Sequence, residues 1–535
     1  MRFVLILIVL FTLVSACGNS NTPDQNTSTA SSSEVPKEIP ASSSSLSKES
    51  ENSSSQISNS ESKEHADAEK TVSTQEKDEQ KELPTPTPKS AVIAPTATPL
   101  PEVDKDKIAT PTAQPEGSSP PAKATSTPTP SPKPFPLDVQ FPLDFSPSGR
   151  YQNFSSSAQT AFQNAIKVNF DKATQKAGVS AAVFDGTQLW TGAEGKASST
   201  DKMTAETPMI IRSTSKTILG ALMVSQVDRG LYSLDDTIES LLANHPDYSL
   251  INTPNVNTQV TVRQLLTMTS GIYDWSQPAD FNRRISIMAD QNWKPANNLK
   301  QITKKFTSPG SYKYSYANSI LLGLIASHLE KKDLNDIYQD QFFKPLGITA
   351  GLLPEIATPE NTAIAHDDLS LYQGGTGFGA LNTGLAGQFY GLDPKISWAG
   401  AGIVSTPENI ARWGYELYSS SGSAVSPSVR TKLIEAMTVP TDPGLTSLGM
   451  HTYGYYMGTG EVTLPDKSSL KVYTHPGGGG GRTSWIYYSP QLDVSVSLLA
   501  NSQMLHNPGS CGYKGRVFMT NGECMAGSIF NALKK

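Results

Sequence analysis

The strongest constraint on the fold is a stretch that is apolar on nearly every side of a helix. Residues 217–224 read "TILGALMV". A helix without a polar face belongs in the interior of a large domain, where other elements surround it. Ser213 and Lys216 come directly before this stretch and, three positions apart, share one face of the helix. Lys216 must therefore enter a largely desolvated region.

Two interpretations of this pair are open. Structurally, Ser213 caps the helix and the Lys216 amine reaches out to water. Functionally, burial lowers the lysine pKa, the amine accepts the serine proton, and the helix N-terminus supplies N–H groups to an oxyanion. The spacing alone is uninformative, because Ser-x-x-Lys also begins at Ser45, Ser60, Ser199 and Ser468.

Two further segments favour the functional interpretation. In "SPGSYKYSYANSILLG", the residues Tyr314, Tyr316 and Asn318 precede a second apolar helix. In "VYTHPGGGGGRTSWIYY", a His475-Pro476-Gly477 triplet lies between two strand-like runs. Strand patterns also occur at 178–195 and near the C-terminus, with mostly helical patterns between them. This order predicts one sheet built from both ends of the domain around a helical insertion.

These motifs, in this order, resemble the serine β-lactamase and penicillin-binding protein superfamily. The branch most similar is that of class C β-lactamases and D-alanyl-D-alanine carboxypeptidases. Supporting segments are "GLYSLDDTIESLL", "VTVRQLLTMTSGI" and "AGAGIVSTPENIARW", and the resemblance runs from about Gly178 to Asn501. It implies an α/β (α+β) fold, with an antiparallel sheet flanked by N- and C-terminal helices and an inserted all-helical subdomain.

The resemblance also implies roles. Ser213 would be the acylated nucleophile, Lys216 would hold its hydroxyl, and a tyrosine with a lowered pKa would act as base and then as acid. The family motif is usually Tyr-x-Asn. If the helix that contains Gly323 is aligned with the family without a gap, Tyr314 falls in the catalytic position. The literal Tyr-x-Asn triplet that begins at Tyr316 requires this helix to start earlier. We favour Tyr314, which leaves Tyr316 or Asn318 to hold the substrate.

The His-Pro-Gly triplet takes the place of the family's Lys-Thr-Gly. The resemblance makes His475 a partner for a substrate carboxylate, on a strand edge that can pair with a peptide. Histidine carries only a partial charge at neutral pH, so it would hold that carboxylate less firmly. Gly477 would allow close substrate approach, and the N–H of Gly478 would form an oxyanion hole with that of Ser213.

The N-terminal part has a different composition. Residues 1–16 have the layout of an export signal, and Cys17 resembles the lipidated cysteine of bacterial lipoproteins. Residues 17–146 are rich in Ser, Thr and Pro and predict a disordered stalk before a domain at 147–535. The protein is expected on the outer face of the cell membrane, or in the periplasm or at the outer membrane. Cys511 and Cys524 would form a disulfide there.

The net charge of -6 and the lack of a basic patch argue against nucleic-acid binding. His366 starts a His-Asp-Asp run, but no second ligand cluster accompanies it, so we expect no metal and no cofactor. The expected function is a monomeric serine hydrolase similar to D-alanyl-D-alanine carboxypeptidases, acting on peptidoglycan peptides and acylated by β-lactams. The alternatives are a β-lactamase, a D-aminopeptidase, an esterase, or a lipoprotein that binds penicillin or cell-wall peptides without turnover.

Overall fold

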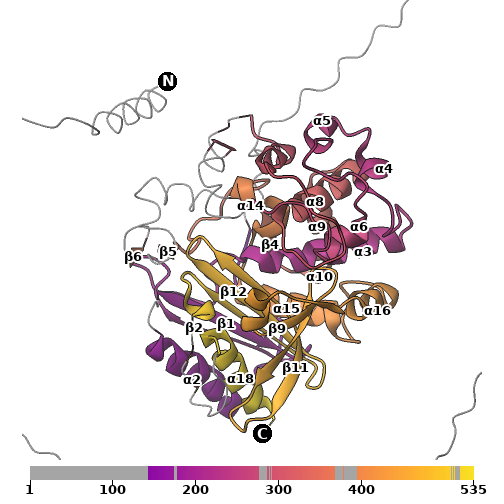
Figure 1. Ribbon diagram of the computed structural model, residues 1–535. Helices are drawn as coiled ribbons and strands as arrows, with labels where there is room; N and C mark the ends of the chain where they lie inside the picture. The colour runs from indigo at the N-terminus through magenta and orange to yellow at the C-terminus, as the bar shows by residue number, and fades with distance from the viewer. Residues whose placement is uncertain are drawn as a thin grey trace, which may run out of the picture. The chain divides into compact units, whose positions relative to one another are not determined.

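The computed structural model (Figure 1) describes residues 143–173, 177–275, 286–287, 290, 292–367, 377–378, 394–507, 509, 511 and 519–534. Cys17, the expected export signal and residues 17–142 of the expected stalk lie outside them. Residues 143–146 contact the domain: Leu143 packs on Leu353, and the Asp144 carbonyl accepts a 2.8 Å hydrogen bond from Thr349. The domain therefore starts before the expected residue 147. No described helix is long and apolar enough to cross a membrane.

The largest sheet has eight antiparallel strands in the order β2-β1-β13-β12-β11-β10-β9-β8. Its strands are β1 (Gly178–Phe184), β2 (Leu189–Gly195), β8 (Val439–Pro440), β9 (Met450–Tyr453), β10 (Gly458–Thr463), β11 (Ser469–Gly479), β12 (Arg482–Ser489) and β13 (Val494–Ala500). The first strand pairs with the last, and Val179 lies opposite Ala500. The predicted sheet built from both ends of the domain is confirmed.

Both faces of this sheet are covered. Helices α2 (Ser156–Lys172) and α18 (Asn521–Leu533) lie together on one face, and α15 (Pro407–Tyr418) packs against strands β1, β12 and β13 on the other (Figure 1). Every residue of β1 is consequently buried. Val183 and its alternate neighbours pack on the α2 and α18 side, while Phe184 packs on the opposite side. This double burial explains why β1 is apolar almost throughout.

A helical region is inserted between the strands, as expected. In chain order it contains η1 (Arg212–Ser215), α3 (Lys216–Asp228), α4 (Ile238–Leu242), α5 (Tyr248–Ile251), α6 (Val262–Leu266), η3 (Pro295–Gln301), α8 (Tyr316–Glu330), α9 (Leu334–Tyr338), the π-helix η4 (Gln339–Phe343), α10 (Lys344–Leu346) and α14 (Pro394–Ala401). The remaining helices are α16 (Pro427–Glu435), α17 (Pro443–Ser447) and η5 (Met504–His506). Two small sheets accompany them: β3 (Met209–Ile210), β7 (Ile403–Ser405) and β4 (Ala350–Leu352), and the pair β5 (His366–Asp367) and β6 (Gly377–Phe378).

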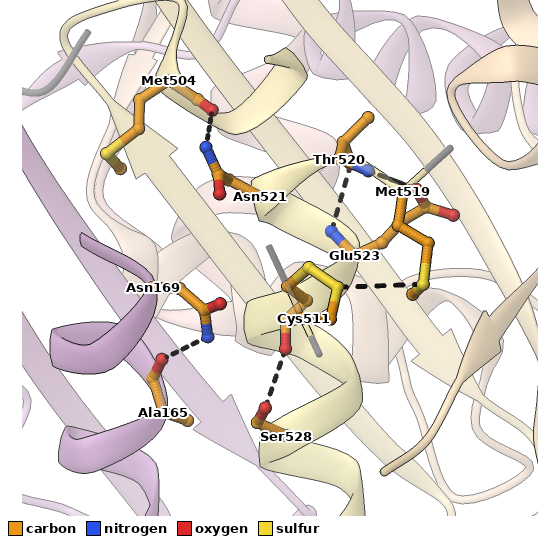
Figure 2. The surroundings of a disulfide bond; sticks show 10 residues. Ala165, Asn169, Met504, Cys511, Met519, Thr520, Asn521, Glu523 and Ser528 are labelled. Carbon is orange, nitrogen blue, oxygen red and sulfur yellow. Dashed lines mark hydrogen bonds between the residues drawn. A yellow bond between two sulfur atoms is a disulfide. The ribbon is translucent and has the colours of Figure 1, made fainter. Parts of the chain in front are cut away.

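A disulfide joins Cys511 to Cys524 of α18 (Figure 2), so the expected pair is present. The helix starts with reciprocal hydrogen bonds: the Thr520 hydroxyl accepts from the Glu523 backbone, and the Glu523 carboxylate accepts from the Thr520 backbone at 2.8 Å. These bonds satisfy backbone N–H groups that a helix start leaves without partners. The disulfide therefore ties the chain before α18 to a helix with a fixed start.

Replacing both Cys511 and Cys524 by Ala should lower the free energy of unfolding. The cross-link spans 13 positions, and closing a loop of that size in the unfolded chain stabilises a protein by about 3 kcal/mol. Urea unfolding of the two proteins measures the loss. Reducing agent provides the control. It should lower the free energy of unfolding of the parent to that of the variant and leave the variant's value unchanged. Equal stability of the oxidised parent and the variant would contradict the expectation.

Candidate active site

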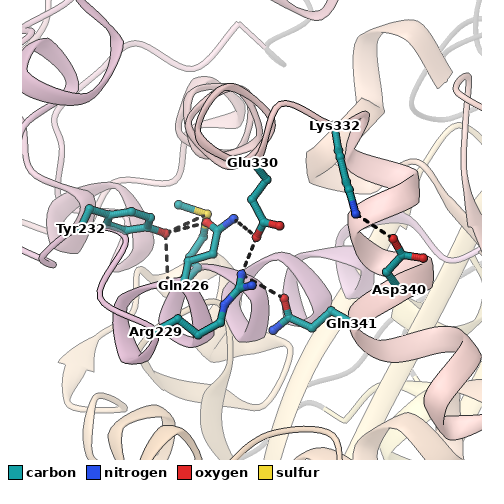
Figure 3. Close-up of polar contacts among 8 residues, drawn as sticks. Gln226, Arg229, Tyr232, Glu330, Lys332, Asp340 and Gln341 are labelled. Atoms are coloured by element: carbon teal, nitrogen blue, oxygen red, sulfur yellow. Dashed lines mark hydrogen bonds and ion pairs between the residues drawn. The ribbon is translucent and has the colours of Figure 1, made fainter.

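Two helices of the inserted region are held together at their C-terminal ends (Figure 3). The Glu330 carboxylate at the end of α8 accepts hydrogen bonds from Arg229 and from Gln226 of α3, the latter at 2.9 Å. The Tyr232 hydroxyl donates to the side chain of Gln226 at 2.9 Å. The candidate residues of the site lie at the opposite, N-terminal ends of these helices. The contacts at Glu330 therefore help to fix how those two ends face one another.

Lys216 begins α3 and is fully buried, while Ser213 is 7 % exposed. The Lys216 amine donates hydrogen bonds to Ser213 Oγ at 3.2 Å and to the Gly400 carbonyl at 2.7 Å. The amine therefore does not extend to water. Ser213 is no helix cap either, since it lies within η1 and α3 begins after Ser215. The structure thus has the geometry of the functional interpretation.

Short contacts on two sides hold the turn that carries Ser213. The Thr214 hydroxyl hydrogen-bonds Ser484 Oγ of β12 at 2.8 Å. On the other side, Ser215 Oγ accepts from the Ile403 backbone of β7 at 3.1 Å. The preceding residue, Arg212, has a φ of 53°, which an L-residue adopts at some cost. The nucleophile candidate therefore lies on a rigid and locally strained turn.

Burial shifts the pKa of the Lys216 amine. Desolvation lowers this pKa well below its ordinary value; nearby Arg212 lowers it further, and Asp274 acts in the opposite direction. A lowered pKa increases the unprotonated share of the amine at neutral pH. An unprotonated amine within 3.2 Å of a serine hydroxyl can accept its proton.

Of the two candidate tyrosines, Tyr314 reaches Ser213. Its hydroxyl lies 2.9 Å from Ser213 Oγ. Tyr316 is the first residue of α8, and the Lys216 amine stands over its ring, 4.4 Å from the centroid. The structure therefore brings Tyr314, Ser213 and Lys216 together and places Tyr316 against the amine.

The predicted direction of the tyrosine pKa shift is wrong. Burial raises the pKa of Tyr314 well above its usual value, Tyr316 adds to the rise, and the hydrogen bond with Ser213 opposes it. We had expected a lowered pKa, but burial penalises the charged phenolate more than the surrounding groups stabilise it. Tyr314 is therefore a neutral phenol at neutral pH, suited to donate or relay a proton.

Asn318 does not face the nucleophile. This residue is fully buried, donates from its amide to the Leu265 carbonyl at 3.0 Å and accepts from the Ser270 hydroxyl at 2.7 Å. Both ends of the amide are thus used inside the helical region, where the side chain fastens α8 to α6. This geometry argues against the expected contact of Asn318 with substrate.

His475 is buried and uncharged. Its Nδ1 donates to the Pro476 carbonyl at 2.7 Å, so in the neutral ring Nε2 accepts from the Tyr453 hydroxyl at 3.0 Å. Desolvation, with the nearby Lys216 charge as the second cause, lowers the pKa of His475 to about 3. A neutral imidazole cannot pair ionically with a carboxylate. The expected charged role of His475 therefore does not fit this environment.

The two glycines serve close packing. A Cβ atom on Gly477 would lie 2.5 Å from the Ile211 carbonyl oxygen and 3.0 Å from the Ser213 backbone nitrogen. Gly477 thus lets β11 approach η1, rather than leaving space for substrate as we had expected. A Cβ atom on Gly478 would lie 2.7 Å from the ring of His506.

One edge of β11 is open beside Ser213. Strand β10 pairs with β11 only as far as Thr474, which lies opposite Gly458. In the described part of the chain, residues 475–479 have no strand partner on that edge. An unpaired strand edge can bind an extended peptide through backbone hydrogen bonds. The sequence analysis expects a peptide to pair on this edge, and that pairing stays a prediction.

A cavity of about 220 Å³ opens at Ser213. It is lined by Ser213, Tyr314, Tyr316, Leu445, Leu448, His475, Pro476, Gly478 and His506. The sequence analysis missed Leu445, Leu448 and His506, which lie in connecting segments without a motif. Larger cavities elsewhere do not include the nucleophile. Within the described residues, no group of three His, Cys, Asp or Glu could hold a metal ion.

Residues 164–509 match the family model described as Beta-lactamase. The chain belongs to the Beta-lactamase family. A curated relative, Protein flp of Staphylococcus aureus (strain COL), is 26% identical over 155 residues. That match covers 28% of this chain and 28% of flp.

Solved structures of similar fold cover most of the domain. D-amino acid amidase from Ochrobactrum anthropi SV3, complexed with L-phenylalanine amide, has a TM-score of 0.56 and 19% identity, covering 71% of this chain and 99% of its own. Beta-lactamase/D-alanine carboxypeptidase from Yersinia pestis has a TM-score of 0.52 and 17% identity, covering 70% and 99%. At these identities the likeness establishes the fold. The reaction that the protein catalyses has to be inferred from the residues around Ser213.

The low pKa of His475 predicts a loss of stability in acid. Since its folded pKa of about 3 lies below the ordinary 6.5, the unfolded chain binds more protons between these pH values, and the free energy of unfolding decreases as the pH is lowered. Each such histidine contributes a slope of up to about 1.4 kcal/mol per pH unit. The stability difference between the parent and His475→Gln should therefore change by about 2 to 3 kcal/mol between about pH 7 and about pH 4. Urea unfolding at several pH values measures it, and a constant difference would contradict the shift.

Proposed function

We propose that this member of the Beta-lactamase family is a serine hydrolase that forms an acyl-enzyme through Ser213. One observation carries the proposal: the Ser213 hydroxyl lies within hydrogen-bond distance of a buried amine, at 3.2 Å, and of a phenol, at 2.9 Å. The amine can take the serine proton and the phenol can supply one to the leaving group. A chain that only binds its ligand has little need for a desolvated lysine beside a serine.

In the acylation step, the Ser213 proton passes to the Lys216 amine while Oγ attacks the acyl carbonyl carbon. The backbone N–H groups of Ser213 and Gly478 stabilise the oxyanion that forms. The Tyr314 hydroxyl protonates the leaving nitrogen or oxygen as the scissile bond breaks. The proton held by Lys216 then restores the phenol. The step leaves an ester on Ser213 and a neutral leaving group.

Deacylation reverses these roles with water. A water molecule loses a proton to Lys216 or through Tyr314, and its oxygen attacks the ester carbonyl. The same N–H groups hold the oxyanion, and the proton returns to Ser213 Oγ as the acyl group leaves as a carboxylic acid. The water oxygen thus ends in the acid, and the enzyme regains its hydroxyl.

The proposed substrates are peptide-like acyl donors, with the D-alanyl peptides of peptidoglycan as the leading class and β-lactams as acylating analogues. The open edge of β11 supports an extended substrate, because residues 475–479 have no strand partner there in the described part of the chain. Alternate residues face the same edge of a strand and Pro476 has no N–H, so part of this segment can pair with a peptide backbone. The names of the neighbouring structures, a D-amino acid amidase and a β-lactamase/D-alanine carboxypeptidase, are compatible with such substrates. Esterase activity and binding without turnover are the alternatives that experiment must separate.

Export also belongs to the proposal. A lipid on Cys17 and a long Ser/Thr/Pro-rich stalk would hold the domain at the outer face of a membrane, where peptidoglycan lies. A monomer suffices for this arrangement, because Ser213, Lys216 and Tyr314 all come from one chain.

Labelling should distinguish Ser213 and the two tyrosines. We expect a fluorophosphonate and a fluorescent penicillin to add one adduct to the parent and none to Ser213→Ala, as measured by intact mass. Tyr314→Phe should slow acylation by the penicillin by about 10² to 10⁴-fold, because a positioned proton donor is worth that much. Tyr316→Phe serves as the matched control, because its hydroxyl is not at Ser213, and it should slow acylation far less.

The outcomes separate the alternatives. An adduct on Ser213→Ala, or equal effects of the two tyrosine variants, would contradict the assignment. Decay of the penicillin adduct with regain of free enzyme indicates turnover, whereas a permanent adduct with every acyl donor indicates a binding protein.

A further inference from the structure

One wall of the cavity at Ser213 is uncharged. Leu445 of α17 and the following Leu448 line it from the connection before β9, and Pro476 and His506 line it from the sheet side. Both leucines are half-buried, so part of each side chain remains open to a ligand. The lining residues include no Lys and no Arg.

This wall belongs to the same cavity as the proposed acid. In the proposed acylation the leaving atom takes its proton from the Tyr314 hydroxyl, which lies 2.9 Å from Ser213 Oγ. Leu445 of α17 and Leu448 line the cavity together with Tyr314. A group released next to Tyr314 inside this cavity therefore lies near these two leucines.

The two histidines at the cavity add no positive charge. Desolvation lowers the pKa of His475 to about 3 and that of His506 to about 4, so both rings are neutral near pH 7. His475 has both nitrogens engaged by Tyr453 and Pro476. A carboxylate that entered this cavity would lose water without gaining an ionic partner, which is costly.

The other nearby cations are occupied or lie elsewhere. Lys216 donates to Ser213 and to the Gly400 carbonyl. The Arg212 guanidinium lies near Gly479, beyond the end of the lining segment of β11, and is not part of the cavity wall. Among the described residues, the lining of this cavity therefore carries little positive charge.

We propose that the enzyme releases an uncharged leaving group, such as the amine of an amide or the alcohol of an ester, in preference to one that carries a free carboxylate. This inference rests on the proposed acyl-enzyme at Ser213. It narrows the proposed peptide-like acyl donors to amidated or esterified ones. D-alanyl peptides with a free terminal carboxylate, the leading class above, rank behind them, because the D-alanine that they release carries that carboxylate.

Two aryl acetates that differ only in charge test the proposal on the full-length protein. One is 4-acetoxybenzamide and the other is 4-acetoxybenzoate, and each enzymatic kcat/KM is divided by the alkaline hydrolysis rate of the same ester. We expect the uncharged ester to be favoured by about 10-fold or more, because a desolvated carboxylate lacks a partner. Leu448→Arg should remove most of this preference. Leu448→Gln, polar but uncharged, is the matched control and should keep it.

The outcomes test the charge preference and the proposed acyl-enzyme separately. Equal or faster hydrolysis of the benzoate overturns the inference and leaves the acyl-enzyme intact. Failure to hydrolyse the benzamide ester, while a fluorophosphonate still labels Ser213, also overturns it. Failure of both hydrolysis and labelling contradicts the proposed function itself. If Leu448→Gln loses the preference as fully as Leu448→Arg, the wall does not select by charge.

Discussion

The site depends on one buried amine and the two oxygens that hold it. Lys216 has no access to water, so its N–H groups need partners within the protein. Ser213 Oγ and the Gly400 carbonyl provide them, at 3.2 Å and 2.7 Å. These acceptors lie far apart in sequence, on η1 and α14. The fold must therefore bring a turn after β3 and a helix before β7 to the same point.

Each of these segments has its own support. Serine and threonine hydroxyls fasten η1 to both neighbouring sheets. In α14, Trp398 interrupts the helix with a φ of 24°, and its indole N–H donates to the Glu355 carboxyl at 2.6 Å. Glu355 also accepts from the Asn335 backbone, and burial raises its pKa to about 8. This buried carboxyl binds two N–H groups next to the bend that places Gly400, and so it helps to fix the position of that bend.

The sequence predicted the elements that depend on local pattern. The apolar stretch after Lys216 predicted a buried helix, and paired strand patterns at both ends predicted the single sheet. The choice of Tyr314 followed from helix register. That register is tightly constrained in the structure, because a Cβ atom on Gly323 of α8 would lie 2.7 Å from the Trp398 ring. Packing that close leaves no room for α8 to slide.

Features that depend on distant contacts could not be predicted. The neutral state of His475 is set by burial and by nearby Lys216, which a local motif does not reveal. The Asn318 side chain points away from Ser213 because Ser270 and Leu265 hydrogen-bond its amide.

Strand β11 and the turn that carries Ser213 lie in very close contact. At Gly477 only a hydrogen atom separates the strand from the Ile211 carbonyl and the Ser213 nitrogen. A methyl group there would force β11 and the turn that carries Ser213 apart, so the spacing between these two segments tolerates less than one additional carbon atom.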